Sequence, residues 1–277
     1  MEKAYLQIVD LYRQEGLKPG RLTQLGYFPK WTVAMGDNGQ IGRAFHFDGE
    51  HAVYPLRDPD VLLPLQRFVG KSLLALAEEL LAETDIQMRA ACLAVLNALS
   101  HPLNQAGQLK KRGFEPVEFD NLEFINTEDR VVLVGYGALI KETLARCSVI
   151  DVCDMRSLSS LRTVSIGRTI EYGPPGIRFH GAAENQTLLA DADIVLISGS
   201  TLVNGTYRDL IRYARKARVI GMFGPSAQLI PEFLQGGGIN YITTSGITDA
   251  DRFYQVLSNP YAGEGESGTY KYTIRMF

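Results

Sequence analysis

The residues best suited to binding a ligand form a cluster of hydroxyl and amide side chains that directly follows an apolar run, DIVLISG at 193–199. The cluster comprises Ser198, Gly199, Ser200, Thr201, Asn204 and Thr206. Small residues at the start of a helix leave backbone N–H groups free to meet an anion, and the helix dipole favours negative charge there. Ordinary capping is the alternative, because Ser, Thr and Asn are preferred N-cap residues. The cluster holds more polar side chains than a cap requires, so it predicts a ligand-binding loop.

A second loop, Gly135-Tyr136-Gly137, begins like the GxGxxG fingerprint of dinucleotide-binding proteins. Ile140 stands where the third glycine would allow close helix packing. Asp154 lies near the place, about 20 residues on, of the acidic residue that binds a ribose. The missing glycine makes classical NAD binding a weak prediction. A tight strand-to-helix turn and an altered ligand site are the two other interpretations.

Two further loops carry glycine and hydroxyl groups after apolar runs. They contain Gly224, Pro225 and Ser226 in the first, and Gly246 within TTSGITD in the second, where Thr248 or Asp249 is expected to cap the last helix. A plain turn explains the first of these loops equally well. In doubly wound sheets, ligands bind outside the carboxyl ends of the strands. We therefore expect the loops to converge on one crevice that forms a polar cradle for a small anionic ligand.

Short apolar runs separated by helix-like stretches fill the second half of the chain. The runs lie at 131–137, 148–154, 193–199, 217–224 and 239–246, and the helix-like stretches near 138–146, 184–190, 204–216, 226–235 and 249–258. Near-continuous Val, Ile and Leu strands between helices are typical of a parallel sheet covered on both faces. Residues 106–277 are therefore predicted to form a Rossmann-like, mostly parallel sheet domain of the α/β class. The tail GEGESGTYKYTIRMF is interpreted as a mobile segment or an added edge strand.

The first half follows a different pattern. A helix is expected over about 2–15, followed by a hairpin from Trp31 to Phe47 with its turn at Asp37-Asn38-Gly39. Two amphipathic helices come next, one around Leu73–Leu80 and one from Met88 that ends at His101-Pro102. Strands followed by helices indicate a smaller α+β domain, which we assign to residues 1–105.

Composition restricts the function classes. Lys and Arg total 28 against 31 Asp and Glu, a net charge of -3, so the chain lacks the basic footprint of a nucleic-acid-binding protein. Apolar runs are too short for a transmembrane helix, and we expect a cytoplasmic protein. The three cysteines show no CxxC spacing, so a structural zinc site is not indicated. The four histidines form no HxxxH or HxxEH pair that would hold a metal. No nucleophile elbow of the GxSxG type occurs, so the sequence does not indicate a serine hydrolase.

Several of these segments resemble a known family. VGYGALI, ADADIVLISGSTLVNGT, MFGPSAQLIPEFLQGGG and SGITD follow one another as in the C-terminal domain of the family called the putative heavy-metal chelation domain. WTVAMG, GKSLLALAEEL and ACLAVLNAL are similar to that family's companion domain, whose fold is like the N-terminal domain of enolase. The resemblance implies a ligand site in the cleft between the two domains. It adds Asn97 as the first domain's polar contribution, with a core amide as the alternative role.

Three functions are compatible with these observations. The first is binding of a divalent metal ion or a metal chelate in the interdomain cleft, in metal homeostasis or in making a chelator, with a hard ion on Asp154 or an organic chelator as the two forms. The second is an enzyme, a transferase or oxidoreductase, that uses a nucleotide-like cofactor over Gly135. The third is a non-catalytic sensor or interaction protein. The sequence identifies no catalytic residue, and it leaves a homo-oligomer open.

Overall fold

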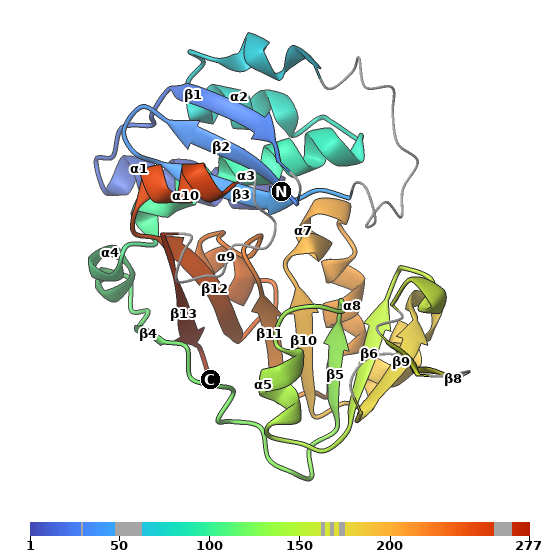
Figure 1. Cartoon of the computed structure of the whole chain (residues 1–277). Coiled ribbons are helices and arrows are strands. Elements are labelled where there is room, and N and C mark those ends of the chain that lie inside the picture. Colours follow the sequence, from blue (N-terminus) through green and yellow to red (C-terminus); the bar gives the residue numbers. More distant parts are fainter. Residues whose placement is uncertain (29, 48–62, 162–163, 167–168, 172–174, 258–267) are drawn as a thin grey trace.

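Two sheets of different size organise the fold (Figure 1), and residues 164–166 and 169–171 form a third, two-stranded antiparallel sheet. The computed structural model describes residues 1–28, 30–47, 63–161, 164–166, 169–171, 175–257 and 268–277. The smaller sheet is antiparallel with the order β1-β2-β3, and the larger has eight strands in the order β4-β13-β12-β11-β10-β5-β6-β9. The predicted α/β class, a mostly parallel sheet preceded by a smaller α+β unit, is confirmed.

The smaller unit contains the predicted hairpin. Its elements are α1 (Glu2–Gln14), β1 (Leu22–Tyr27), β2 (Trp31–Gly36), β3 (Ile41–Phe45), the 3₁₀ helix η3 (Leu63–Phe68), α2 (Leu73–Leu80) and α3 (Ile86–Leu103). β2 and β3 are antiparallel, and Gly39 in their turn has a φ of 78°, which favours glycine. The end predicted at His101-Pro102 for the second amphipathic helix, α3, is wrong, because this helix continues to Leu103. Proline in a final turn removes one N–H donor but does not prevent the helix from closing with Asn104 N–H on Ser100 O.

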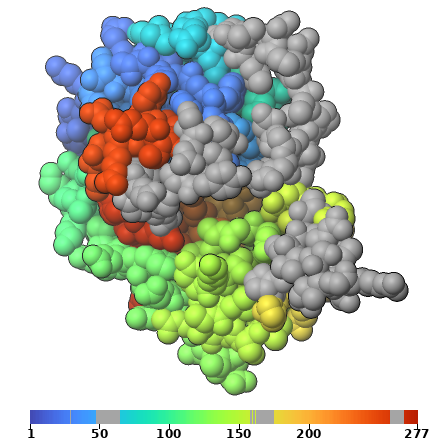
Figure 2. All heavy atoms as spheres, in the orientation of Figure 1, coloured from blue at the N-terminus to red at the C-terminus, as the bar shows by residue number. Residues whose placement is uncertain are grey.

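The two faces of the small sheet pack against different partners. Ala34 and Ala44 belong to the cluster of apolar residues around α3, whereas Val33 and Ile41 pack with Phe253. Phe253 lies on α10 (Ala250–Val256), a helix from the second half of the chain. Figures 1 and 2 show this helix, in orange, against the blue strands of the first unit. The alternation of side chains across a strand thus buries one face within the unit and the other face against α10.

The larger sheet is parallel over six neighbouring strands. They are β5 (Val131–Val134), β6 (Ile150–Asp154), β9 (Ile177–Gly181), β10 (Ile194–Ser198), β11 (Val219–Phe223) and β12 (Tyr241–Ile247). From β5 the chain runs outward through β6 to β9, then returns to β10 on the other side of β5 and continues to β12. This is the order of doubly wound sheets, and the direction reverses between β5 and β10.

Two antiparallel strands extend the sheet beyond β12. β13 (Thr269–Arg275) pairs with β12 on one side and with β4 (Pro116–Glu118) on the other. The prediction of a strand in the C-terminal tail is correct for these residues, but the strand is internal and β4 occupies the edge. The tail residues 258–267 lie outside the described residues.

Helices connect the parallel strands, although several are shorter than predicted. They are α5 (Ile140–Leu144), α6 (Asn185–Ala190), α7 (Ser200–Asn204), α8 (Tyr207–Tyr213) and α9 (Pro231–Gln235), with 3₁₀ turns η4 (Leu158–Leu161) and η5 (Ala182–Glu184). A further helix, α4 (Ala106–Lys111), lies between α3 and β4. The helix predicted over 204–216 corresponds to α8, which is shorter, and α7 precedes it; Gly205, with a φ of 81°, separates the two helices. Among the described helices, none has the length and apolar character needed to cross a bilayer.

The sequence analysis did not identify β1, β7 (Val164–Ile166), β8 (Thr169–Glu171) or β9. The last three fall between two predicted elements. β9, the sequence IRFHG, is half-buried at one edge of the sheet, so it lacks the continuous apolar run that identified its neighbours.

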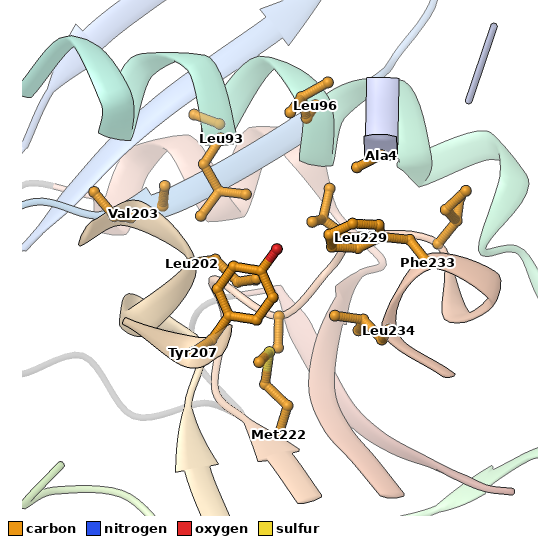
Figure 3. Packing of buried hydrophobic residues seen from close by; sticks show 14 of the residues in the cluster. Ala4, Leu93, Leu96, Leu202, Val203, Tyr207, Met222, Leu229, Phe233 and Leu234 are labelled. Atoms are coloured by element: carbon orange, nitrogen blue, oxygen red, sulfur yellow. The ribbon is translucent and has the colours of Figure 1, made fainter. Parts of the chain in front are cut away.

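One apolar cluster joins the two units. Figure 3 shows Leu93 of α3 beside Leu202 and Val203 of α7, and Leu96 of α3 and Phe233 of α9 belong to the same cluster. The side chains in this cluster are almost fully buried. Burying such side chains stabilises a fold by roughly 1.5–3 kcal/mol each, so the carboxyl ends of β10 and β11 are held firmly beneath α3.

Candidate functional site

The loops after β5 and β10 meet where the strand order reverses. Gly135 has a φ of 102°, and a β-carbon built on it would lie 2.9 Å from Cβ of Ser198. Only glycine therefore allows these two strand ends to approach so closely. Oγ of Ser198 lies 2.9 Å from Oγ of Ser200, and both residues are half-buried. One hydrogen bond between two hydroxyls leaves further donor and acceptor capacity for a ligand.

Asp154, at the end of β6, fixes the loop that follows β5. Its Oδ2 accepts a 2.8 Å hydrogen bond from the Tyr136 N–H, and both of its oxygens accept hydrogen bonds from Arg156. Burial acts to raise the pKa of Asp154, but the hydrogen bonds from Arg156 and Tyr136 outweigh burial and hold that pKa below its ordinary value. The guanidinium of Arg156 also donates to the Tyr136 carbonyl oxygen at 2.9 Å. Asp154 thus acts here as an internal anchor.

The geometry of this loop differs from that of a dinucleotide fingerprint. Leu139 adopts a left-handed conformation with a φ of 68°, and α5 after it has only five residues. Ile140, in the place of the third glycine, is 5% exposed and packs in the core. Both oxygens of the acidic residue expected on a ribose, Asp154, are already engaged by Arg156 and Tyr136. These features all weigh against the classical NAD interpretation.

Other members of the hydroxyl cluster stabilise the backbone. Oδ1 of Asn204 accepts hydrogen bonds from both the N–H and the hydroxyl of Thr206, at 3.1 and 2.7 Å. The hydroxyl of Thr201 donates to the Ser198 carbonyl oxygen at 2.7 Å. Nδ2 of Asn204 lies 3.5 Å from Sδ of Met155, which brings the loop after β6 beside α7. Capping, the alternative interpretation, therefore accounts for part of the cluster, and Ser198 and Ser200 are the hydroxyls left at the reversal point.

A second group of predicted residues lies at the junction with the first unit. A β-carbon on Gly199 would meet the Ala227 N atom at 2.7 Å, so this glycine permits close packing of two loops. Ser226 is 2% exposed, and its Oγ accepts a 2.8 Å hydrogen bond from the Phe45 N–H. Nδ2 of Asn97 donates to the carbonyl oxygens of Arg43 and Ser226 at 2.8 and 3.1 Å. These contacts hold the two units together.

The loop after β11 is shaped by backbone hydrogen bonds. Gly224 has a φ of 92°, its N–H donates to Thr243 O, and its carbonyl oxygen accepts from Ala227 N and from the Thr244 hydroxyl. Gly224 and Pro225 are half-buried. This loop is the tight turn of the alternative interpretation, placed against the first unit by Ser226.

Gly246 lies within β12, one residue before the strand ends. A β-carbon there would lie 2.3 Å from the ring of Tyr270 on β13, so glycine makes room for this aromatic side chain. The predicted cap of the last helix is confirmed for Asp249, whose Oδ1 accepts from Arg252 N. Gly246 also lines a small pocket together with Asn97.

The predicted single crevice is therefore divided. Gly135, Tyr136, Gly137, Ser198 and Ser200 surround the reversal point of the strand order. Gly199 and Ser226 lie at the junction with the first unit, Thr201 and Pro225 belong to the same two loops, and Asn97 and Gly246 border the pocket at β12 and β13. The division arises because α3 and β3 pack against α7 and the loop after β11, which follow the central strands β10 and β11.

Several residues near these sites carried no recognisable signal in the sequence. Met155 and Arg156 at the reversal point, and Asn104 and Gln228 at the pocket, are isolated polar or apolar residues without motif spacing. For Met155 and Arg156 the sequence offered one signal, because they directly follow Asp154 at the end of a predicted strand, and ligands bind at the carboxyl ends of such strands.

The described residues contain no group of three or more His, Cys, Asp or Glu side chains placed to hold a metal ion. Cys92, Cys147 and Cys153 are buried free thiols, and burial raises the pKa of Cys153 to about 12. A thiol with that pKa is protonated at neutral pH and is a poor ligand for a soft metal. The donors at the reversal point are hydroxyl and backbone groups, so this part of the chain does not fit a bare heavy-metal ion.

Comparison with known proteins identifies relatives along almost the whole chain. The sequence model of the DUF364 family, described as "Putative heavy-metal chelation", matches residues 119–276, and a second model with the same description, DUF4213, matches residues 10–100. The chain is 40% identical over 92 residues to "Uncharacterized protein MJ0500" of Methanocaldococcus jannaschii, a match that spans 35% of that relative's length.

Two crystal structures of DUF364 proteins with unknown function share the fold. The protein from Pyrococcus horikoshii has a TM-score of 0.70 at 20% identity, with 98% of each chain covered. The protein from Desulfitobacterium hafniense has a TM-score of 0.68 at 18% identity, with 97% of this chain and 98% of that chain covered. The resemblance noted from VGYGALI and GSTLVNGT is thereby confirmed, while the likeness of the first unit to the N-terminal domain of enolase stays a prediction. The chain belongs to the DUF364 family, whose description is putative heavy-metal chelation.

Proposed function

We propose that the protein binds a small anionic ligand, an organic metal chelator or its metal complex, at the reversal point between β5 and β10. The observation that carries this proposal is the pair of half-buried hydroxyls of Ser198 and Ser200, 2.9 Å apart and directly beside the left-handed Gly135. Doubly wound sheets bind their ligands at this topological position, outside the carboxyl ends of the strands.

The donor set selects the form in which a metal would arrive. Hydroxyl groups and backbone N–H groups recognise the oxygens of a carboxylate or phosphate, whereas soft metals prefer thiolates and imidazoles. Asp154 is the carboxylate nearest this point along β6, and Arg156 and Tyr136 already occupy both of its oxygens. A chelator that brings its own donors to the metal therefore suits the loop better than a bare ion held by Asp154. The family description supports a role in metal handling.

Thermal unfolding of the metal-stripped full chain tests the proposal. The probes are zinc and nickel chloride, citrate, the citrate complexes of both metals, inorganic phosphate, adenosylmethionine and NAD. A ligand at about 100 times its dissociation constant stabilises a protein by about 2.7 kcal/mol, or roughly 5–10 °C in Tm for a chain of this size. We expect citrate or a citrate complex to raise Tm in the native chain and to lose this effect in the Ser198→Ala/Ser200→Ala variant.

A matched double variant, Thr127→Val/Ser148→Ala, controls for general effects. Both residues are exposed. Thr127 precedes β5 and Ser148 precedes β6, so both lie near the amino ends of these strands, opposite the proposed site. It should retain the full ligand response. A response that persists in Ser198→Ala/Ser200→Ala, or a response to NAD or adenosylmethionine alone, would contradict the proposal. Asn204 is unsuitable for this test because its substitution would also remove the hydrogen bonds to Thr206.

A further inference from the structure

A small pocket lies between the two units beside β12 and β13, away from the reversal point between β5 and β10. It is lined by Ile41, Asn97, His101, Asn104, Gln105, Gln228, Ser245, Gly246, Ile247, Tyr270 and Tyr272. Its cavity volume is about 20 Å³. About 10–15 Å³ suffices for one water molecule, so the space suits a group with one or two non-hydrogen atoms.

Three side-chain amides of this lining have fixed orientations. The Asn97 NH₂ group donates to the carbonyl oxygens of Arg43 and Ser226, the Asn104 NH₂ group to that of Gln228, and the Gln228 NH₂ group to that of Ser245. A carbonyl oxygen only accepts hydrogen bonds, so each amide must present its nitrogen to the backbone. The opposite atom of each amide, an oxygen, is thereby turned away from these carbonyl groups.

These three amide oxygens are buried and lack hydrogen-bond partners within the described part of the chain: Asn97 Oδ1, Asn104 Oδ1 and Gln228 Oε1. Asn97 is fully buried and Gln228 is 8% exposed. A buried polar atom without a partner destabilises the fold, and three around one small pocket are unusual. An occupant that donates hydrogen bonds would remove this cost.

The charges around the pocket limit what that occupant is. All three free positions are acceptors, so an anion would be repelled by them. Among the described residues the lining contains no Asp or Glu, and the guanidinium of Arg43 donates to Oγ of Ser245 and lies over the rings of Trp31 and Phe253. This buried positive charge disfavours a cation next to Ser245.

The protonation state of His101 also affects the charge of the lining. Its Nδ1 accepts a hydrogen bond from Ile41 N–H at 3.2 Å, and burial lowers its pKa despite an opposing hydrogen bond to the Gly39 backbone. The imidazole is therefore neutral at pH 7, and below its pKa it would add a second positive charge to the lining. An uncharged group that donates hydrogen bonds therefore matches the three free acceptors and avoids repulsion from the positive charge of Arg43.

We propose that this pocket takes up the NH₂ end of an uncharged N–H donor, such as a primary amide or a urea, through the amide oxygens of Asn97, Asn104 and Gln228, because its volume admits only one or two non-hydrogen atoms. The site is independent of the proposed ligand at Ser198 and Ser200, since the two share no residue. It gives the domain junction a second point at which a small molecule contacts both units.

Titrations of ¹⁵N-labelled full-length protein test this site, with the side-chain amide signals of Asn97, Asn104 and Gln228 as the readout. The probes are acetamide, N,N-dimethylacetamide, which lacks N–H donors, and methylammonium, which carries a charge. We expect saturable shifts of these signals with acetamide and none with the other two at equal concentration. Asn104→Leu should weaken acetamide binding by about three- to tenfold, the effect of one hydrogen bond. Asn126→Leu, an exposed position, should leave it unchanged.

Three results would overturn the proposal. Equal binding of N,N-dimethylacetamide would show that N–H donation is irrelevant, and stronger binding of methylammonium would show a cation site. Absence of saturable shifts with every probe would show that the pocket holds only water. Each comparison among probes uses the native chain, so it stands even if Asn104→Leu fails to fold.

Discussion

The backbone N–H of Phe45, in β3, donates a 2.8 Å hydrogen bond to Oγ of Ser226, in the loop that follows β11. The two residues are 181 positions apart: Phe45 belongs to the small sheet, and Ser226 follows a strand of the large sheet. Ser226 is almost fully buried, so no solvent can replace this acceptor. The contact ties the first unit to the end of a central strand of the second.

Ser226→Ala should lower the free energy of unfolding by about 1–3 kcal/mol, because it removes the buried hydroxyl that accepts the hydrogen bond from the Phe45 N–H. Denaturant unfolding gives the change, and hydrogen exchange of the Phe45 amide should become faster. Ser148→Ala, at an exposed position, should stay within about 0.5 kcal/mol of the native chain. Unaltered stability in Ser226→Ala would mean that this hydrogen bond does not hold the junction.

Gly135→Ala should destabilise the protein by about 1–3 kcal/mol, because an alanine would be strained at a φ of 102° and its β-carbon would press on Ser198. Gly137→Ala is the matched comparison in the same loop, since no atom lies within 4 Å of its built β-carbon and its φ is not positive. Gly137→Ala should be close to neutral. Thermal and denaturant unfolding of both variants measure the difference, and equal effects would refute the close approach at the reversal point.

Asp154 should make stability depend on pH in the acid range. Its pKa in the folded chain lies below the ordinary value of about 3.9 for the unfolded chain, so the folded state favours the ionised form. The stabilisation is complete above the unfolded pKa and is lost as pH falls through the folded pKa. In Asp154→Asn the stability should be lower at pH 7 by about 1–3 kcal/mol, with the difference from the native chain shrinking below about pH 4. Urea unfolding between pH 2.5 and 7, run as about six points, measures both curves. A constant difference across this range would exclude Asp154 as the titrating group.

Phe253→Ala should loosen α10 from the small sheet. Phe253 is 2% exposed and packs against Val33 and Ile41, and its ring lies 5.3 Å from the Arg43 guanidinium carbon. Loss of a buried phenylalanine costs about 3–5 kcal/mol. Gln255→Ala on the exposed side of the same helix should cost less than about 0.5 kcal/mol. Limited proteolysis should cut near α10 sooner in Phe253→Ala, and identical cleavage rates in the two variants would contradict the packing role.

The strands of the parallel sheet could be recognised from the sequence because local residues alone determine their pattern. β5 and β10 lie in the middle of the sheet with both faces covered, so almost every side chain in VVLV and IVLIS is buried and apolar. β9, at an edge, alternates less clearly and escaped recognition. The cap at Asp249 was likewise predictable, since it needs only the N–H of Arg252 three residues ahead.

The arrangement of the candidate sites was decided by the tertiary structure. The sequence placed hydroxyls and glycines at four strand ends, but only packing of α3 and β3 over the sheet buries Ser226 and leaves Ser198 and Ser200 at the reversal point. Asn97, Asn104 and Gln228 come together around one pocket from positions up to 131 residues apart, which spacing cannot reveal. Local pattern determined the elements of this protein because helix and strand periodicity depend on near neighbours. Contacts between distant residues depend on how whole elements pack, and those contacts determined which polar groups were satisfied internally and which were left for a ligand.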